Sequence, residues 1–427
     1  MTFYKETDFQ DFIIGRISED WNIESLQDVL VLLKNGLTVK QNKEGNGYPI
    51  TRIETISQER IDSDRIGYSP EISERDVEEY KLIKGDILFS HINSLAHIGK
   101  TALYEGTPEL LLHGMNLLLL RPNKEKIHSE YLLYILKLLK IRNVFWSMSK
   151  KAVNQASINQ TELGRLRIPV PSVEEQRGVV GVLGVVDSAI ELVDRVIWKT
   201  ERLKKGLMQT LLTRGIGHKE YKDTPIGKIP KDWNVARINQ ISEVHRGASP
   251  RPIGDSKYFS ETGRGWIRIS DVTNAYKYLS KTSQYLSELG ESKSVKVNQR
   301  DLVMSICATI GKPVIIDMKA CIHDGFVVFR NLSKDVDTEF LFYLLQKNEL
   351  RFRNMKQTGT QGNLNTTLVG ETFIPVPSLS EQKQIADILS TVDEKIELER
   401  KEKTRLEKVK RGLMDLLLTG KVRVKVD

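Results

Sequence analysis

Basic and amide side chains gather in two stretches, one in each half of the chain. Residues 34–65 contain Lys40, Lys43, Asn46 and Arg52. Residues 245–268 contain Arg246, Ser249, Arg251, Lys257, Arg264 and Arg268. Two different polar surfaces, one in each half, suggest two different recognition events, so we take these residues as candidate DNA contacts. The alternative is that both are solvent loops whose sequences have drifted.

A second pair of polar stretches recurs in the two halves. Lys150, Asn154 and Gln155 belong to residues 150–159, which correspond to residues 356–365 with Lys356, Gln361 and Asn365. Either stretch alone fits ordinary turn chemistry. Lysine suits phosphate, and asparagine or glutamine suits the edge of adenine, so the recurrence of these residues at the same place favours DNA contact. We include all six residues among the predicted contacts.

Catalytic patterns are missing from the sequence. Gly99-Lys100-Thr101 resembles the end of a P-loop, but Ser94 stands where the first glycine is needed. His91, His97, His113 and His323 are scattered and fit structural roles better than a metal site. The chain has no Pro-Pro pair, which an adenine methyltransferase loop needs, and no convincing nuclease signature. We predict no catalytic, cofactor-binding or metal-binding residue.

These side chains are positioned by a duplicated framework. Ile168-Pro-Val-Pro-Ser172 recurs as Ile374-Pro-Val-Pro-Ser378, and the offset of 206 residues holds from Ile168 to Thr213. The opening motif of residues 12–23, with Asp20-Trp21-Asn22, recurs in residues 224–235. A fixed register of this length indicates an internal duplication, here of the whole plan.

Each copy ends in a predicted long helix. Ser172-x-x-Glu175 and Ser378-x-x-Glu381 follow prolines and are typical of capping boxes, so we expect serine and glutamate to bond each other's backbone amides. Apolar residues then recur at heptad-like spacing, which predicts that the two helices pair. The predicted pairing residues are Leu183, Val186, Ile190, Ile197, Leu207, Leu211, Leu389, Val392, Ile396, Leu406, Leu413 and Leu417. Lys204, Glu399, Lys403 and Lys410 interrupt this seam, either exposed or facing another subunit.

Between opening motif and long helix, each half has a mixed α/β pattern. Residues 85–90 and 300–305 predict buried strands, and residues 116–120 and 326–329 predict further strands. Ser129 and Thr338 are expected to cap matching helices. We place the first domain at residues 1–167, the first long helix at 168–215, the linker and second domain at 216–373, and the second helix and tail at 374–427.

Composition sets broad limits. The 427 residues are 40% hydrophobic and 28% charged, with a net charge of +8 that favours a polyanionic partner. No apolar stretch is long enough to span a membrane and the N-terminus does not resemble a signal peptide, so a cytoplasmic protein is expected. Two cysteines, Cys307 and Cys321, suggest neither disulfides nor zinc.

The order of these motifs resembles the specificity (S) subunit of Type I restriction-modification enzymes. The resemblance rests on Ile-Gly-x-Ile-x-x-Asp-Trp, a variable domain, Ile-Pro-x-Pro-x-x-x-Glu-Gln and a helix ending Gly-Leu-Met-x-x-Leu-Leu-Thr, all present twice. It implies an α+β fold of two target recognition domains joined by an antiparallel coiled coil, with a pseudo-twofold repeat. Trp21 and Trp233 would brace the domain openings.

The same resemblance implies a non-catalytic subunit that reads a bipartite, asymmetric target in double-stranded DNA. Its protein partners would be two methylation subunits and the restriction (motor) subunits. No membrane is expected among its partners. The methylation subunits would methylate adenine N6. S-adenosylmethionine, Mg and ATP are expected on the partner subunits, and no cofactor is expected in this chain.

Other functions remain open from sequence. A related multisubunit system that cuts near its site would use a similar recognition subunit. A coiled-coil scaffold without DNA binding is disfavoured by the paired domains, and a self-contained methyltransferase or nuclease by the missing motifs.

Overall fold

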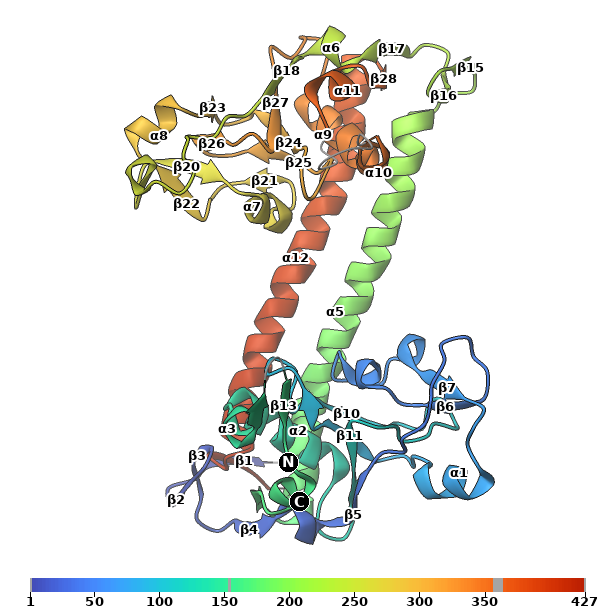
Figure 1. Cartoon of the computed structure of the whole chain (residues 1–427), viewed down its shortest axis with the longest axis vertical. Coiled ribbons are helices and arrows are strands. Elements are labelled where there is room, and N and C mark those ends of the chain that lie inside the picture. The colour runs from blue at the N-terminus through green and yellow to red at the C-terminus, as the bar shows by residue number, and fades with distance from the viewer. Residues whose placement is uncertain (1, 153–154, 356–363, 426–427) are drawn as a thin grey trace. The chain divides into compact units, whose positions relative to one another are not determined.

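The computed structural model describes residues 2–152, 155–355 and 364–425. They form two compact units, residues 1–194 with 402–427 and residues 195–401. Each unit therefore contains one globular domain and parts of both long helices (Figure 1). Each described unit can be taken by itself.

The first unit is built on an antiparallel sheet of four strands in the order β10-β8-β11-β5. Its bounds are β5 Leu30–Asn35, β8 Ile87–Ser90, β10 Thr101–Leu103 and β11 Leu117–Pro122. Small sheets surround it: β1 Thr2–Lys5 with β29 Val422–Lys425, β2 Phe9–Phe12 with β3 Gly15–Ser18, β4 Asn22–Ser25 with β14 Arg167–Val170, β6 Tyr48–Ile50 with β7 Gly67–Ser69, and β9 Ile92–Asn93 with β12 Lys150–Ala152 and β13 Gln155–Ser157. Its shorter helices are α1 Glu74–Tyr80, α2 Ser129–Ile141, α3 Val144–Met148 and α4 Gln160–Gly164.

The second unit has two sheets of five strands. One is ordered β18-β27-β24-β25-β21, with bounds Glu243–Arg246, Phe326–Arg330, Leu302–Ser305, Pro313–Ile316 and Tyr278–Leu279. The other is β19-β22-β20-β26-β23, with bounds Phe259–Ser260, Gln284–Leu286, Arg264–Ile267, Ala320–Ile322 and Val295–Val297. Two antiparallel pairs complete it: the hairpin of β15 Tyr221–Thr224 with β16 Gly227–Pro230, and the long-range pair of β17 Asn234–Arg237 with β28 Phe373–Val376. Its shorter helices are α6 Ile238–Ile241, α7 Ile269–Asn274, α8 Glu288–Ser292, α9 Thr338–Lys347, α10 Glu349–Asn354 and α11 Thr366–Gly370.

The predicted buried strands and the predicted mixed α+β class are confirmed, but the expected helix caps are wrong by one residue. α2 begins after His128 and α9 after Asp337. The Asp337 carboxylate accepts hydrogen bonds from the amides of Glu339 and Phe340. Aspartate is a strong cap in its own right, so Thr338 is displaced into the first turn.

The long helices are α5, Val173–Arg214, and α12, Leu379–Leu417, close to their predicted bounds. In the first unit, Val179 and Leu183 of α5 share a hydrophobic core with Met414 and Leu417 of α12. In the second unit, Leu211 of α5 shares a core with Ile385 and Leu389 of α12. The start of one helix lies with the end of the other in each unit, which confirms the antiparallel pairing.

None of the twelve predicted pairing residues is exposed. Leu183, Leu211, Leu389, Ile396 and Leu417 are buried, and Val186, Ile190, Ile197, Leu207, Val392, Leu406 and Leu413 are half-buried. Several of them pack into the core of a globular domain as well as along the seam. The same apolar face therefore holds each domain to the helix pair.

Candidate nucleic-acid interface

The domains are fixed to the helices by a polar cluster that occurs once in each unit. In the first, the Tyr134 hydroxyl of α2 donates to Asp187 of α5 over 2.7 Å, and Lys410 of α12 pairs with the same carboxylate. In the second, Tyr343 of α9 donates to Asp393 of α12 over 2.7 Å, and Lys204 of α5 pairs with Asp393 over 2.7 Å. Figure 1 shows α2 and α9 beside the long helices to which these bonds tie them.

These clusters explain the lysines that interrupt the apolar seam. Lys204 is buried and Lys410 half-buried, each paired with the opposite helix. Lys403 likewise pairs with Asp194 over 2.6 Å. Burial, together with the neighbouring carboxylate, raises the pKa of Tyr134 and Tyr343, so both hydroxyls remain donors. The three lysines are therefore part of helix pairing.

A second duplicated contact joins each opening motif to the first turn of its long helix. Trp21 Nε1 donates to Glu175 over 3.3 Å, and Trp233 Nε1 donates to Glu381 over 2.9 Å. The serine half of each expected capping box is present, because Ser172 Oγ accepts from the Glu175 amide and Ser378 Oγ from the Glu381 amide. The glutamate half is wrong, since both carboxylates bind tryptophan and basic partners instead.

The glutamine that follows each glutamate is fully buried and binds the domain. Gln176 accepts from the amide of His128 and donates to the carbonyls of Lys126 and Pro171. Gln382 makes the equivalent bonds to the amide of Asp337 and the carbonyls of Asp335 and Pro377. The repeated Glu-Gln dipeptide therefore fixes the helix start against its domain.

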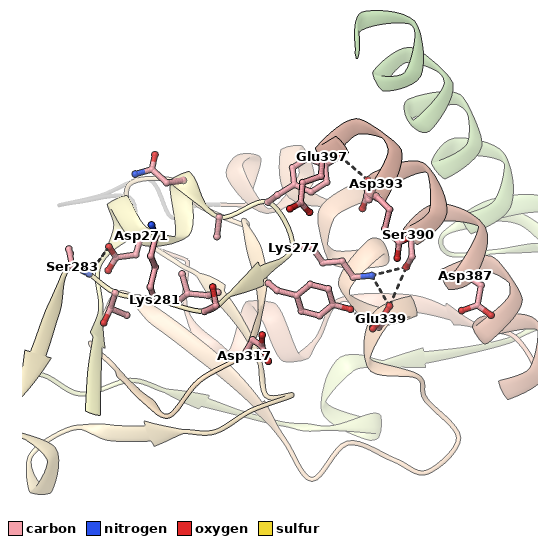
Figure 2. Close-up of a pocket in the computed structure, with 18 residues that line it drawn as sticks. Asp271, Lys277, Lys281, Ser283, Asp317, Glu339, Asp387, Ser390, Asp393 and Glu397 are labelled. Carbon is pink, nitrogen blue, oxygen red and sulfur yellow. Dashed lines mark hydrogen bonds and ion pairs between the residues drawn. The ribbon is translucent and has the colours of Figure 1, made fainter. Parts of the chain in front are cut away.

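A cavity of about 920 Å³ in the second unit is acidic (Figure 2). Its carboxylates are Asp271, Asp317, Glu339, Asp387, Asp393, Glu394 and Glu397. Lys277 points into this group and donates to Glu339 over 2.6 Å and to Ser390 over 2.7 Å. Carboxylates repel phosphate, so this cavity is unsuited to DNA.

A basic cavity of about 480 Å³ lies elsewhere in the second unit, and three predicted contacts line it: Arg246, Arg251 and Arg268. Arg246 ends β18, Arg251 lies in the following loop, and Arg268 precedes α7. Folding thus brings together side chains up to 22 residues apart, as counted between Arg246 and Arg268. Such convergence of guanidinium groups suits a polyanion.

Asp324, in the turn before β27, organises this basic cavity. Its carboxylate accepts from Ser249 Oγ and, over 3.1 Å, from Arg251, while its carbonyl accepts from Arg246 Nε over 2.8 Å. The hydrogen bond from Ser249 lowers the pKa of Asp324 against the opposing effect of burial. The carboxylate is thus ionised and holds Arg251 in the cavity, while the backbone carbonyl of the same residue holds Arg246. Burial lowers the pKa of His323, beside it, to about 4, so His323 adds no charge at neutral pH.

The other predicted contacts of the second domain that the structure describes do not line this cavity. Lys257 is exposed and pairs with Asp255 over 2.8 Å. Arg264 donates to the carbonyls of Val297 and Ala320 and so ties strands together. Asn365 caps α11 by accepting from the Leu368 amide. Lys356 and Gln361 lie outside the described residues.

The first unit has a cavity of different composition, about 450 Å³ in volume. Lys43, Arg52 and Arg65 line it together with Glu54, Asp64, Ser63, Ile66 and Tyr68. Arg52 Nε pairs with Glu54 over 3.3 Å. Burial raises the pKa of Glu54, but its hydrogen bonds, including that from Arg52, lower it overall. Two carboxylates thus accompany three cations, against one carboxylate in the second unit.

The remaining predicted contacts of the first domain that the structure describes do not line this cavity. Lys40 and Asn46 are exposed near it in sequence. Lys150 is exposed on β12 and lies 3.5 Å from Glu162, and Gln155 is exposed at the start of β13. Asn154 lies outside the described residues.

Sequence analysis missed Asp324 and Tyr68, and treated His323 only as a structural residue. Asp324 reaches Arg246 because β27 pairs with β18 across 78 residues of sequence, which no local pattern reveals. The duplicated cluster did leave a signal: Asp187 and Asp393, like Lys204 and Lys410, are separated by the repeat offset.

Within the described residues, no group of His, Cys, Asp and Glu could hold a metal ion, and no helix is apolar and long enough to cross a membrane.

Comparison with known proteins decides the family. The profile described as "Type I restriction modification DNA specificity domain" matches residues 18–200 and again 230–408. The chain belongs to this family. A putative Type I restriction enzyme MjaX specificity subunit of Methanocaldococcus jannaschii is 42% identical over 100% of the chain and 99% of its own length. The MjaVIII specificity subunit of the same organism is 29% identical over 100% and 98%.

Solved structures of this family share the fold. The crystal structure of the Type I S subunit from M. genitalium has a TM-score of 0.57 at 13% identity, covering 96% of this chain and 97% of its own. A chain of another type I R-M system has a TM-score of 0.56 at 17% identity, covering 94% and 98%. Specificity subunits are non-catalytic and recognise DNA targets, so the basic cavities are the candidate site.

Proposed function

We propose that the chain reads a split, asymmetric target in double-stranded DNA, one half-site with each domain. The observation that carries this proposal is the difference between two basic cavities on one duplicated framework. Arg246, Arg251 and Arg268 line one, and Lys43 and Arg52 line the other. Two copies of one domain would favour a palindrome, whereas two unlike domains favour unlike half-sites.

The proposal includes the partners. Two methylation subunits dock on the helix pair, carry S-adenosylmethionine and methylate adenine N6 in each half-site, and restriction subunits that use ATP and Mg join through them. Exposed apolar residues support two equivalent docking sites. Leu192 and Val409 are exposed in the first unit, and their repeat equivalents Leu398 and Leu203 are exposed in the second.

The recognition proposal is tested by mapping methylated adenine. The chain is co-expressed with its methylation subunit, as wild type and with Arg246, Arg251 and Arg268 all changed to Gln. We expect a single split motif for the wild type and loss of selectivity in one half only for the variant. Selectivity retained in both halves would reject the cavity as a reader, and a wild type without any split motif would reject the function itself.

The docking proposal is tested by stoichiometry. Leu192→Lys with Val409→Lys should reduce the complex from two methylation subunits to one in native mass spectrometry, because charge opposes burial of that surface. Ile83→Lys changes an exposed apolar residue outside the helices and serves as the control. Two subunits retained by the double variant would count against this site.

A further inference from the structure

The basic cavity of the second domain offers a particular set of donors. Arg246 uses only Nε in its bond to the Asp324 carbonyl, and Arg251 uses only one terminal nitrogen in its bond to the carboxylate. The Arg268 guanidinium makes no hydrogen bond or ion pair with any residue that the structure describes. Each guanidinium therefore retains a pair of adjacent N–H groups, the fork that binds two acceptors in one plane.

Asp324 adds an acceptor beside these donors. Its side chain is 38% exposed, and that of Arg251 is 69% exposed, so both can reach a ligand. Arg251 and Asp324 lie 3.1 Å apart, close enough for both to address one base pair. The Asp324 carboxylate accepts one hydrogen bond from Ser249 and one from Arg251. Its oxygens keep further lone pairs that can accept from a ligand.

The base pairs differ in what they present to such a pair of groups. In the major groove guanine presents two acceptors, O6 and N7, and its partner cytosine presents the N4 donor. Adenine presents a donor beside its N7 acceptor, which suits an amide side chain. The described residues that line this cavity include no asparagine or glutamine. Its chemistry thus matches G·C and not A·T.

Building on the proposed function, we propose that the second domain reads a G·C base pair, with Arg251 donating to guanine O6 and N7 and Asp324 accepting from cytosine N4. Arg246 and Arg268 neutralise the flanking phosphates. Ile253, Ile269 and Ile306 supply the apolar wall of the same cavity. Asp324 has two roles, since it also fixes the orientation of Arg251.

The test uses the full chain in complex with its methylation subunit and a library of duplexes with randomised half-sites. Arg251→Lys retains the charge but loses the fork, so preference for G·C at one position should fall about tenfold or more. Arg251→Gln should shift that position toward adenine. Asp324→Asn should weaken the same preference at that position alone. Lys319→Gln, an exposed cation outside the cavity, should change nothing.

The outcomes separate this inference from the function on which it rests. Unchanged preference in the other half-site shows that each variant is folded and assembled. A half-site for this domain composed only of A·T pairs, or a G·C preference that survives both Arg251 variants, would overturn the G·C assignment. A wild-type complex that selects no split target would instead overturn the proposed function.

Discussion

At the junction between the long helices and the globular domain, the two units use the same residue types. In the basic cavities, the two units use different residue types. Tyr134 and Tyr343 each donate a hydrogen bond to an aspartate of one long helix. A lysine of the other long helix pairs with the same aspartate. The cavities differ in their carboxylates, two in the first unit and one in the second. A junction must keep its geometry for both domains to be held alike, whereas a reading surface is free to change its chemistry.

The junctions also differ in burial, which yields the largest expected effect. The side chains of Lys204 and Asp393 are 10% and 5% exposed, against 18% and 33% for Lys410 and Asp187. Lys204→Met leaves a buried carboxylate without its cation and should cost the second unit about 3 kcal/mol or more. Lys410→Met should cost the first unit only about 1 kcal/mol. Amide hydrogen exchange in graded urea measures each unit separately.

Two further variants sharpen that measurement. Lys205→Met removes a neighbouring exposed lysine and should be nearly silent. Changing Asp393 to Asn together with Lys204→Met removes both charges and should recover much of the loss, because the amide oxygen still accepts from Tyr343 and no buried charge is left unpaired. Equal costs for Lys204→Met and Lys410→Met would show that burial does not distinguish the junctions.

Acid should affect the first unit through His113. Burial lowers the pKa of His113 to about 4 from 6.5, its Nε2 lies 3.0 Å from the Leu117 carbonyl, and its buried Nδ1 has no partner among the described residues. Between those pH values only the unfolded chain binds the proton. The stabilisation is therefore complete above pH 6.5 and is lost as pH falls toward 4, by up to about 3 kcal/mol.

The comparison is made with His113→Gln, which keeps a donor near the position of Nε2. Urea unfolding from pH 6.5 to 4 should depend less on pH for this variant than for the wild type. Asn46→Gln changes an exposed residue of the same unit whose side chain carries no titratable group, and it should leave the pH dependence unchanged. Equal pH dependence in all three proteins would remove His113 as the cause.

Much of the framework could be predicted because its sequence motifs occur twice in the chain. The prolines and serines before each long helix fix its start, and the repeat offset fixes which segments correspond. From the sequence, Lys204 and Lys410 were seen only as charged residues that interrupt an apolar seam. Their ion-pair partners could not be identified, because those lie on the opposite helix. A pairing register cannot be read from one helix alone.

The candidate site was harder to predict. Arg246, Ser249, Arg251 and Arg268 were found because they are polar residues in a stretch where the two halves diverge. Arg264 belongs to the same stretch, yet its guanidinium donates to the carbonyls of Val297 in β23 and Ala320 in β26, the two strands that follow β20 in the sheet. Asp324 follows a buried strand and gave no local signal. Long-range strand pairing decides which polar residues converge.

The first-turn glutamates are expected to differ in a way that the identical motifs hide. Glu175 receives two bonds from Arg423, of 2.6 and 2.9 Å, whereas Glu381 receives one from His218 over 2.9 Å. Glu175→Gln therefore weakens a buried ion pair and should cost about 2 kcal/mol, although Arg423 keeps Glu6 as a partner. Glu381→Gln should cost about 1 kcal/mol.

Hydrogen exchange in the two units again provides the measurement, with Glu174→Gln as a control. Glu174 lies in the same first turn but is exposed, so its substitution should be nearly silent. A larger cost for Glu381→Gln than for Glu175→Gln would mean that the tryptophan bond, common to both, outweighs the arginine.

The smallest effect concerns Lys43, which lines the first cavity but is exposed. A lysine that contacts phosphate contributes equally to every DNA sequence, whereas the Arg251 fork discriminates among them. Lys43→Gln should therefore leave the methylated motif unchanged and reduce the slope of log binding constant against log salt by about 1. Lys124→Gln, an exposed lysine of the same unit outside that cavity, should leave the slope intact. A changed motif in Lys43→Gln would make Lys43 a base reader, and the two cavities would then share one mode of recognition.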